Sequence, residues 1–77
     1  MEDKLKLNTG DTLKQTNHRS KGTMGQTDIW SYDVLDSNQN KVGSVVHTDH
    51  TSLNGFQRTQ SVEQRDVNGK IIVDISW

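Results

Sequence analysis

The chain has 77 residues, with nine Lys and Arg against ten Asp and Glu, and contains neither Cys nor Pro. This length allows a single domain, residues 1–77, and the missing Cys excludes disulfide scaffolds, Cys-based zinc modules and thiol enzymes. No apolar run is long enough to span a membrane, and the net charge of −1 argues against nucleic acid as a partner. Because so small a domain gains little from burial, we expect stabilisation by self-association or by another protein.

Residue usage favours strands over helices. The sequence lacks Ala, the best helix former, but contains eight Thr and seven Val, whose branched Cβ atoms suit a pleated sheet. The pattern predicts an all-β fold of about six antiparallel strands, joined as a hairpin meander that forms a small barrel or a strongly curved sheet. Charged residues at the start indicate that no intact signal peptide is present, so we expect a cytoplasmic protein, with a mature secreted form as the alternative.

The first two predicted strands are short and polar. Residues 4–7 alternate Lys and Leu, residues 8–11 form a turn, and residues 12–16 return as the second strand. Lys at their exposed positions is typical of edge strands. Residues 17–26 contain two Gly and show no apolar periodicity, which predicts a long loop.

The central hairpin joins residues 27–35 to residues 42–48. A pairing of Leu35 with Val42 predicts three further pairs: Trp30 with His47, Tyr32 with Val45, and Val34 with Gly43. Apolar side chains then lie on both faces, as in central strands. One face can form the core while the other is left for binding.

The last hairpin joins residues 56–65, after a predicted loop over residues 49–55, to residues 70–77. One face of its second strand carries a predicted core stripe of Ile71, Val73, Ile75 and Trp77. A two-residue turn at Asn68-Gly69 sets Val62 opposite Ile75. A type I turn with a Gly bulge over residues 66–70 is the alternative, and it would shift the pairing by one residue.

The two hairpin turns resemble each other. Residues 36–42 and 66–71 share a pattern of Asp, Asn, Lys and a β-branched residue. Asp36, Asn38 and Asn40 also have the spacing that starts a calcium loop, but the Gly and Glu that such a loop requires are replaced by Lys and His. We therefore expect one Asx-rich hairpin design used twice.

A second possible cation site follows in the chain. His47, Asp49 and His50 provide at most three ligands for a divalent ion, with no clear fourth. The alternative is a set of solvated side chains with His47 stacked beside Trp30. We predict no metal and no cofactor.

Two further groups of residues suggest catalysis or ligand binding. A metal-free ribonuclease needs two imidazoles and a cation, and the sequence supplies these groups as His18, His47 and His50 with Lys14, Arg19 or Arg58. Their spacing does not show that they converge. Lys14, His18, Arg19 and Lys21 also form a local basic patch, which could meet phosphate or an acidic protein but is typical of a solvated loop.

Glu63 and Asp74 are predicted to face each other across the last hairpin. Two carboxylates in this arrangement are destabilising unless a cation lies near them. They could form an acid-base site, but we favour a solvent-facing pair relieved by Arg65 and Arg58.

We expect the chain to be a non-catalytic protein-binding module, such as a small inhibitor or immunity-type protein that neutralises its partner. The predicted binding residues are Trp30, Tyr32, Val45, His47 and Arg58. Two alternatives remain open: a small β-barrel that binds a sugar or a nucleotide, and a histidine-dependent ribonuclease.

Overall fold

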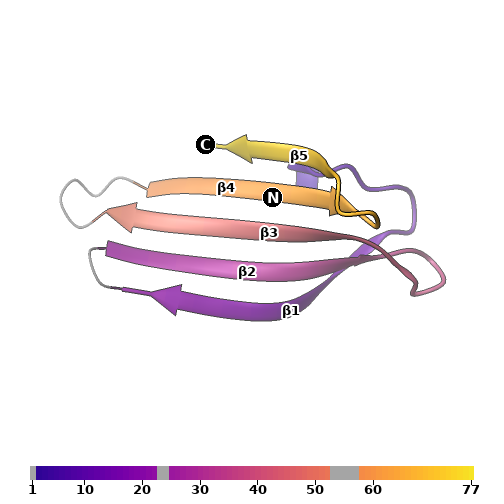
Figure 1. The fold of residues 1–77 in the computed structure, drawn as a ribbon, viewed down its shortest axis with the longest axis horizontal. Coiled ribbons are helices and arrows are strands. Elements are labelled where there is room, and N and C mark those ends of the chain that lie inside the picture. The colour runs from indigo at the N-terminus through magenta and orange to yellow at the C-terminus, as the bar shows by residue number, and fades with distance from the viewer. Residues whose placement is uncertain (1, 23–24, 53–57) are drawn as a thin grey trace.

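The computed structural model describes residues 2–22, 25–52 and 58–77. A 3₁₀ helix, η1 (Glu2–Lys4), precedes five strands: β1 (Thr12–Lys21), β2 (Gly25–Leu35), β3 (Lys41–Ser52), β4 (Arg58–Asp66) and β5 (Ile71–Ser76). They form one antiparallel sheet in the order β1-β2-β3-β4-β5 (Figure 1). In these residue ranges, no helix has both the length and the apolar character needed to cross a membrane.

The predicted all-β antiparallel meander is confirmed, but the predicted closure is wrong. A barrel requires the first and last strands to pair, whereas β1 and β5 lie at opposite edges of the sheet. The sheet is open and only gently twisted, with principal extents of 45 × 20 × 19 Å (Figure 1).

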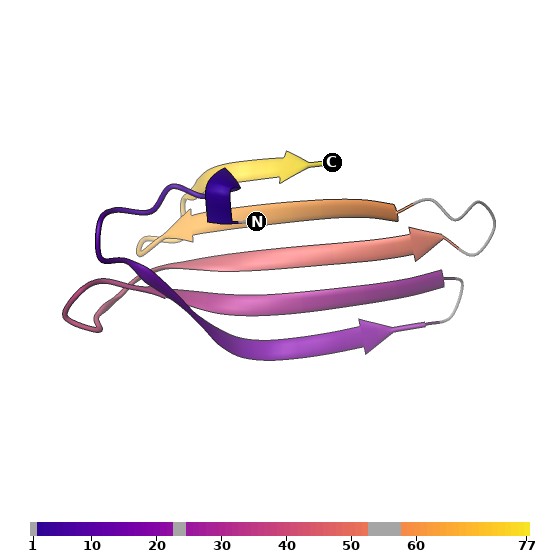
Figure 2. The same cartoon turned by 180° about the vertical axis from the view of Figure 1, so that it is seen from behind.

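The sixth predicted strand, residues 4–7, does not join the sheet. Instead, η1 and the residues after it cross one face of the sheet at the end where the two hairpin turns lie (Figure 2). The amide of Gln64 holds this segment, because its Oε1 accepts a hydrogen bond from Lys6 N and its Nε2 donates one to Lys6 O, both at 2.8 Å. A side chain therefore supplies the bonds that a neighbouring strand would otherwise provide.

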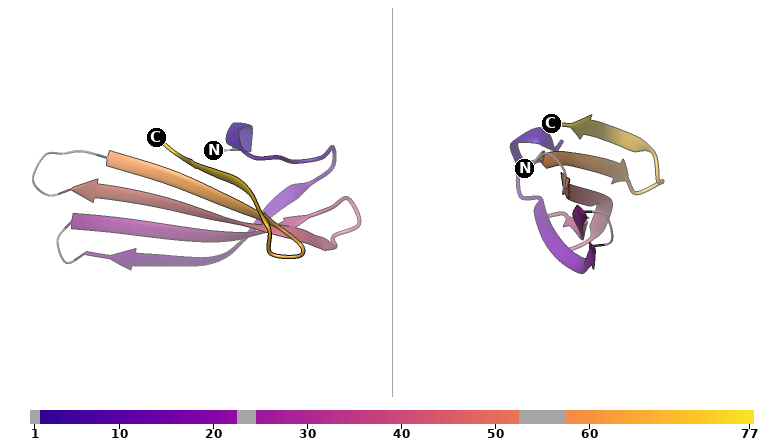
Figure 3. Two further views of the ribbon diagram at one scale, coloured as in Figure 1. Left: turned by 45° about the horizontal axis from the view of Figure 1, so that its top comes forward. Right: turned by 90° about the vertical axis from the view of Figure 1, so that its left-hand side faces the viewer.

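The hydrophobic core lies beneath this N-terminal segment. Val34, Val45 and Val62 are only 1–2% exposed, and five partly buried residues pack against them: Leu5, Leu7, Leu13, Tyr32 and Val73. Viewed from the end of the sheet, the N-terminal segment lies on one side only (Figure 3). We call the side that carries Val45 the covered face, and the opposite side, which carries Val46, the open face.

The predicted core stripe on β5 is largely wrong. Val73 packs against the core, but Ile71, Ile75 and Trp77 are 40–44% exposed. Ile75 and Trp77 lie on the covered face beyond the part that the N-terminal segment covers. The bulge at Ile72 turns Ile71 to the opposite face, where it pairs with Arg65.

The strand pairing of the central hairpin is confirmed at three positions. Trp30 pairs with His47, Tyr32 with Val45, and Val34 with Gly43. At the turn, however, Leu35 pairs with Lys41, which leaves Val42 as a bulge residue. The predicted pairing of Leu35 with Val42 is therefore wrong, although the register beyond it is right.

The final hairpin has the alternative turn, not the preferred two-residue turn, but it keeps the pairing that the preferred turn predicted. Gly69 N donates to Asp66 O and Asp66 N donates to Lys70 O, which is the turn with a Gly bulge that was the alternative. Val62 nevertheless pairs with Ile75, because Ile72 forms a second bulge that restores the register.

The two turns share one structure, as the sequence predicted. Asp36 Oδ1 accepts hydrogen bonds from the main-chain N–H groups of Asn38 and Asn40, at 2.8 and 2.9 Å. Asp66 Oδ1 accepts the equivalent pair from Asn68 and Lys70, at 2.9 and 3.0 Å. In both hairpins a single bulge follows, so the same local chemistry sets both registers.

Two predicted loops are partly strand. Residues 17–21 belong to β1, residues 25 and 26 begin β2, and residues 49–52 end β3. Main-chain hydrogen bonds to a neighbouring strand extend these elements although their sequences lack apolar alternation. The predictions for residues 53–57, which include Phe56, and for residues 23 and 24 lie outside the described residues.

Candidate binding surface

Beyond the N-terminal segment, the covered face carries four stacked rings. The strand register places His18 on β1, Trp30 on β2 and His47 on β3 directly opposite one another. Trp77 follows β5, and its main chain exchanges hydrogen bonds of 2.8 and 2.9 Å with Gln60. The ring centroids are 5.0, 5.2 and 6.0 Å apart in the order His18, Trp30, His47, Trp77, and we call this series the ring ladder.

The ring ladder presents its edges to solvent. Adjacent strands lie about 4.8 Å apart, so rings standing upright on neighbouring strands turn their faces toward each other. The planes of successive rings differ by 4–22°. At one end of the series, Lys4 Nζ lies 4.9 Å from the centroid of Trp77, a cation–π contact. The rings are therefore held in place by one another and by the N-terminal segment.

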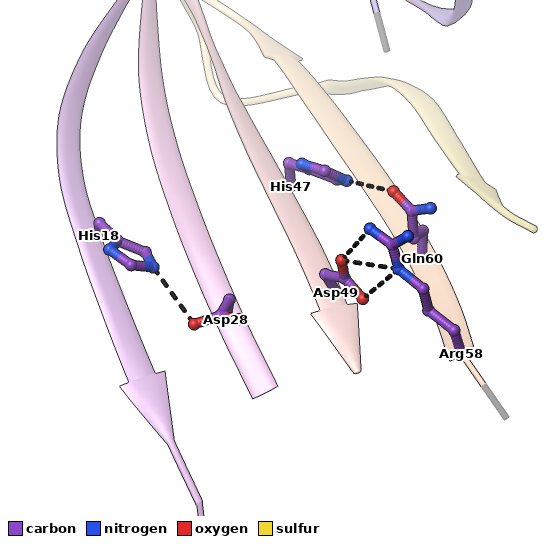
Figure 4. Close-up of polar contacts among 6 residues, drawn as sticks. All are labelled: His18, Asp28, His47, Asp49, Arg58 and Gln60. Atoms are coloured by element: carbon purple, nitrogen blue, oxygen red, sulfur yellow. Dashed lines mark hydrogen bonds and ion pairs between the residues drawn. The ribbon is translucent and has the colours of Figure 1, made fainter. Parts of the chain in front are cut away.

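A row of charged residues lies next to the ring ladder. Asp28 and Asp49 are paired across β2 and β3, an arrangement that repels unless each carboxylate has its own partner. Asp28 Oδ1 accepts a 2.7 Å hydrogen bond from Ser20 Oγ and lies 3.3 Å from His18 Nε2 (Figure 4). Asp49 receives two hydrogen bonds from Arg58 Nε, at 2.9 and 3.0 Å, and one of 2.5 Å from Arg58 Nη2.

Within this row, the ion pair between Asp49 and Arg58 shifts the pKa values of both partners. Hydrogen bonding to Arg58 lowers the pKa of Asp49, and the same contact raises the pKa of Arg58. The Asp49 side chain is 12% exposed and that of Arg58 is 60% exposed, so the guanidinium faces solvent at the rim. Beside this pair, His47 Nε2 lies 3.1 Å from Gln60 Oε1 (Figure 4).

The structure places the five predicted binding residues unequally. Trp30, His47 and Arg58 come together on the covered face, in the half that lies beyond the N-terminal segment. Tyr32 packs against the core, and Val45 is 1% exposed within it, so Val45 supports the surface from beneath and does not face solvent.

Two members of the ring ladder were not predicted as binding residues. His18 fell in a predicted loop and Trp77 in the predicted core stripe. The β2–β3 register was the signal available for Trp30 and His47, whereas β1 has no apolar alternation that would reveal its own register.

The three residues of the possible cation site do not converge. His50 lies on the open face, where its Nδ1 is 2.6 Å from Thr27 Oγ1, while His47 and Asp49 lie on the covered face. In the described part of the chain, no group of three or more His, Asp or Glu residues could hold a metal ion. Among the predicted ribonuclease groups, His18 and His47 share a face, but the indole of Trp30 stands between their rings.

No protein-family model, no curated protein and no solved structure matches this chain.

Proposed function

We propose that the chain is a non-catalytic protein-binding module, of the inhibitor or immunity type that neutralises its partner. The observation that carries the proposal is the ring ladder, which lies on the half of the covered face that the N-terminal segment leaves bare. Trp77 is 42% exposed, and Trp30 stays half-buried in the middle of the sheet. Aromatic anchors have few rotatable bonds, and these are already fixed by stacking, so binding costs little entropy.

The surroundings of the ring ladder suit a protein interface. Such interfaces combine an aromatic centre with a polar rim, and here the rim is supplied by Arg58 with Asp49 and by Asp28. Stacking of a sugar or a base needs an accessible ring face, whereas the faces within the ring ladder are turned toward one another. The geometry therefore favours a protein partner over the sugar or nucleotide alternative.

The proposal is tested with a partner captured from the native cell and then purified. Replacing Trp30 by Ala should weaken binding by roughly tenfold or more, the usual effect of removing an aromatic hot spot. The variant Val67→Ala is the control, because Val67 lies in the β4–β5 turn, 69% exposed and away from the ring ladder. Isothermal titration measures both affinities.

A second variant distinguishes loss of binding from misfolding of Trp30→Ala. Arg58→Glu reverses the charge at the rim without removing a ring, so it should slow association with the same partner. Equal affinity for wild type, Trp30→Ala and Arg58→Glu would contradict the proposal. RNA cleavage that is lost on replacing His18 or His47 would instead support the ribonuclease. A change in tryptophan fluorescence with a glycan or an oligonucleotide would support binding of a sugar or a nucleotide by the open sheet.

A further inference from the structure

The open face of the sheet lies on the side away from the N-terminal segment. In Figure 1, which looks onto this face, the N-terminal segment lies behind the sheet and the β4–β5 turn projects toward the viewer at one end. Small and β-branched residues occupy its centre: Ile29 and Ser31 on β2, Val46 and Thr48 on β3, and Ser61 on β4. Val46 is 38% exposed although it lies on the middle strand. Only Ile29 and Val46 are apolar among these five, but all five side chains are small or β-branched, so a second sheet can approach this centre closely, as in a β-sandwich.

The open face carries basic residues along one edge. Lys14, Arg19 and Lys21 on β1 point to this face, because they pair with residues of β2 that alternate with Trp30 and Tyr32. None of the three forms an ion pair within the described residues. Three like charges therefore line the β1 edge, and the acid directly opposite Lys14, Asp33 on β2, is paired with Lys41 at 3.2 Å.

A pair of carboxylates with a single cation lies at the opposite edge of the same face. Asp74 on β5 is directly opposite Glu63 on β4, as the sequence predicted. Arg65 Nε bonds Glu63 Oε1 at 2.5 Å, but Arg58, the other predicted cation, bonds Asp49 on the covered face. Asp74 thus has no cation within ion-pair distance in the part of the chain that the structure describes. Strands β2, β3 and β4 separate Asp74 from the basic residues of β1.

We propose that the open face binds the open face of a second copy of this chain, about a two-fold axis parallel to β3. Such an axis places β1 of each copy over β5 of the other, and β2 over β4. The register runs from Arg19 through Ile29, Thr48 and Ser61 to Ser76, so Arg19 faces Ser76 of the second copy, with Asp74 two residues away on the same strand face. Both edges thereby gain the opposite charge.

The same axis also gives suitable contacts at the centre of the interface and a sufficiently large contact area. Val46 and Thr48 face their own copies. Asp33, which pairs with Lys41, faces Arg65 of the second copy, which pairs with Glu63, so opposite charges and no like charges meet at this position. The chain extends 45 Å along its longest axis and 20 Å across it, a span comparable with the ~800 Å² that each partner contributes to a standard interface. Pairing of two β1 edges is disfavoured, because it would bring six basic side chains together. The dimer leaves both ring ladders accessible and does not depend on the proposed function.

Sedimentation equilibrium of the purified chain tests the dimer, up to millimolar concentration. The wild type should show twice the monomer mass of 8.7 kDa, and Val46→Lys should show the monomer mass. Val67→Lys is the matched control, since it makes the same substitution in the exposed turn and should remain dimeric.

Charge reversal tests the orientation of the two copies. Arg19→Glu and Asp74→Lys should each weaken the dimer, by at least several-fold in dissociation constant, and the double variant should restore it. Circular dichroism establishes that each variant is folded. A monomeric wild type, a Val46→Lys variant that still dimerises, or a double variant that fails to recover would overturn the proposal.

Two other results would also overturn it. Masses beyond a dimer would indicate edge-to-edge assembly, and loss of the dimer in Trp30→Ala but not in Val46→Lys would assign the interface to the ring ladder. The outcome is distinct from that of the proposed function, because partner capture by Trp30 and Arg58 is measured separately.

Discussion

One residue distinguishes the two otherwise equivalent turns. The left-handed position is Gly69 in the β4–β5 turn, with φ of 84°, but Gln39 in the β2–β3 turn, with φ of 69°. A side chain at such a φ meets a steric penalty that glycine avoids. The β2–β3 turn therefore contains a locally unfavourable residue in an otherwise suitable turn sequence.

Replacing Gln39 by Gly should stabilise the chain by about 0.5–1 kcal/mol, since the penalty at positive φ exceeds the added entropy of glycine in the unfolded state. Urea denaturation measures the free energy of unfolding. The reciprocal change, Gly69→Gln, should destabilise by a similar amount. If Gln39→Gly leaves the midpoint unchanged, the backbone at this position carries no penalty.

Asp36 makes the stability of the first turn depend on pH. Hydrogen bonds from the main-chain N–H groups of Asn40 and Asn38 lower its pKa from 3.8. A lowered folded pKa means that the charged carboxylate stabilises the fold above the unfolded value and that this contribution disappears as the pH falls through the folded value. The β2–β3 turn should therefore weaken in acid.

Asp36→Asn tests this dependence. Its urea midpoint should lie below that of the wild type near neutral pH, and the gap should narrow between roughly pH 5 and pH 2, where the wild-type carboxylate is protonated. Asn retains an acceptor oxygen but has no charge, so the variant isolates the titration. A gap that stays constant over this range would show that the charge of Asp36 does not contribute.

At the scale of elements, bulges explain why both hairpins keep the predicted strand register although the pairing next to each turn differs from the prediction. A one-residue shift would move every side chain to the other face. In both hairpins, however, a bulge at Val42 or Ile72 follows the turn at once and cancels the shift. The period-two pattern of the strands, with Val45 and Val62 buried, favours the register that keeps these residues in the core.

The N-terminal segment depends on a single buried amide. Gln64 is 2% exposed and satisfies both main-chain groups of Lys6. Gln64→Glu would remove the donor to Lys6 O and place a carboxylate in the core, which should cost about 2–4 kcal/mol at pH 7 and less where the carboxyl is protonated.

Urea denaturation and hydrogen exchange of the Lys6 amide measure this loss. Gln15→Glu is the control, because Gln15 is exposed on the edge strand β1 and should tolerate the charge. Unchanged protection of the Lys6 amide in Gln64→Glu would mean that other contacts, such as those of Leu5 and Leu7, hold the segment alone.

At the scale of the whole molecule, the hydrophobic core is small: among the described residues, the buried hydrophobic side chains are those of three Val residues. Ordering a chain of this length costs about as much free energy as its burial returns. Covering the open face with a second copy would add apolar and charged contacts that a single sheet lacks. Stability and assembly should therefore be coupled.

The melting temperature should rise with protein concentration, by a few degrees for each tenfold increase, because dissociation accompanies unfolding of a dimer. Calorimetry over a dilution series measures this. Val46→Lys should melt at a lower temperature that does not depend on concentration. A wild-type melting temperature that is independent of protein concentration would show that assembly does not contribute to stability.

The sequence by itself determined the strand content and most of the local pairing. Absence of Ala, abundance of Val and Thr, and Asx-rich turns predict antiparallel hairpins through interactions between near neighbours. Trp30 and His47 were recognisable as neighbours for the same reason, since a short turn joins their strands.

Only the tertiary structure decided whether the sheet closes, where residues 4–7 lie, and which rings join Trp30 and His47. Each of these depends on contacts between distant parts of the chain: Lys6 and Gln64 are 58 residues apart, and Trp77 reaches His47 from beyond β5. Local alternation is compatible with several such arrangements, because it specifies which side of a strand is apolar but not which segment covers that side. The covering segment is selected by the total burial and hydrogen bonding of the folded chain.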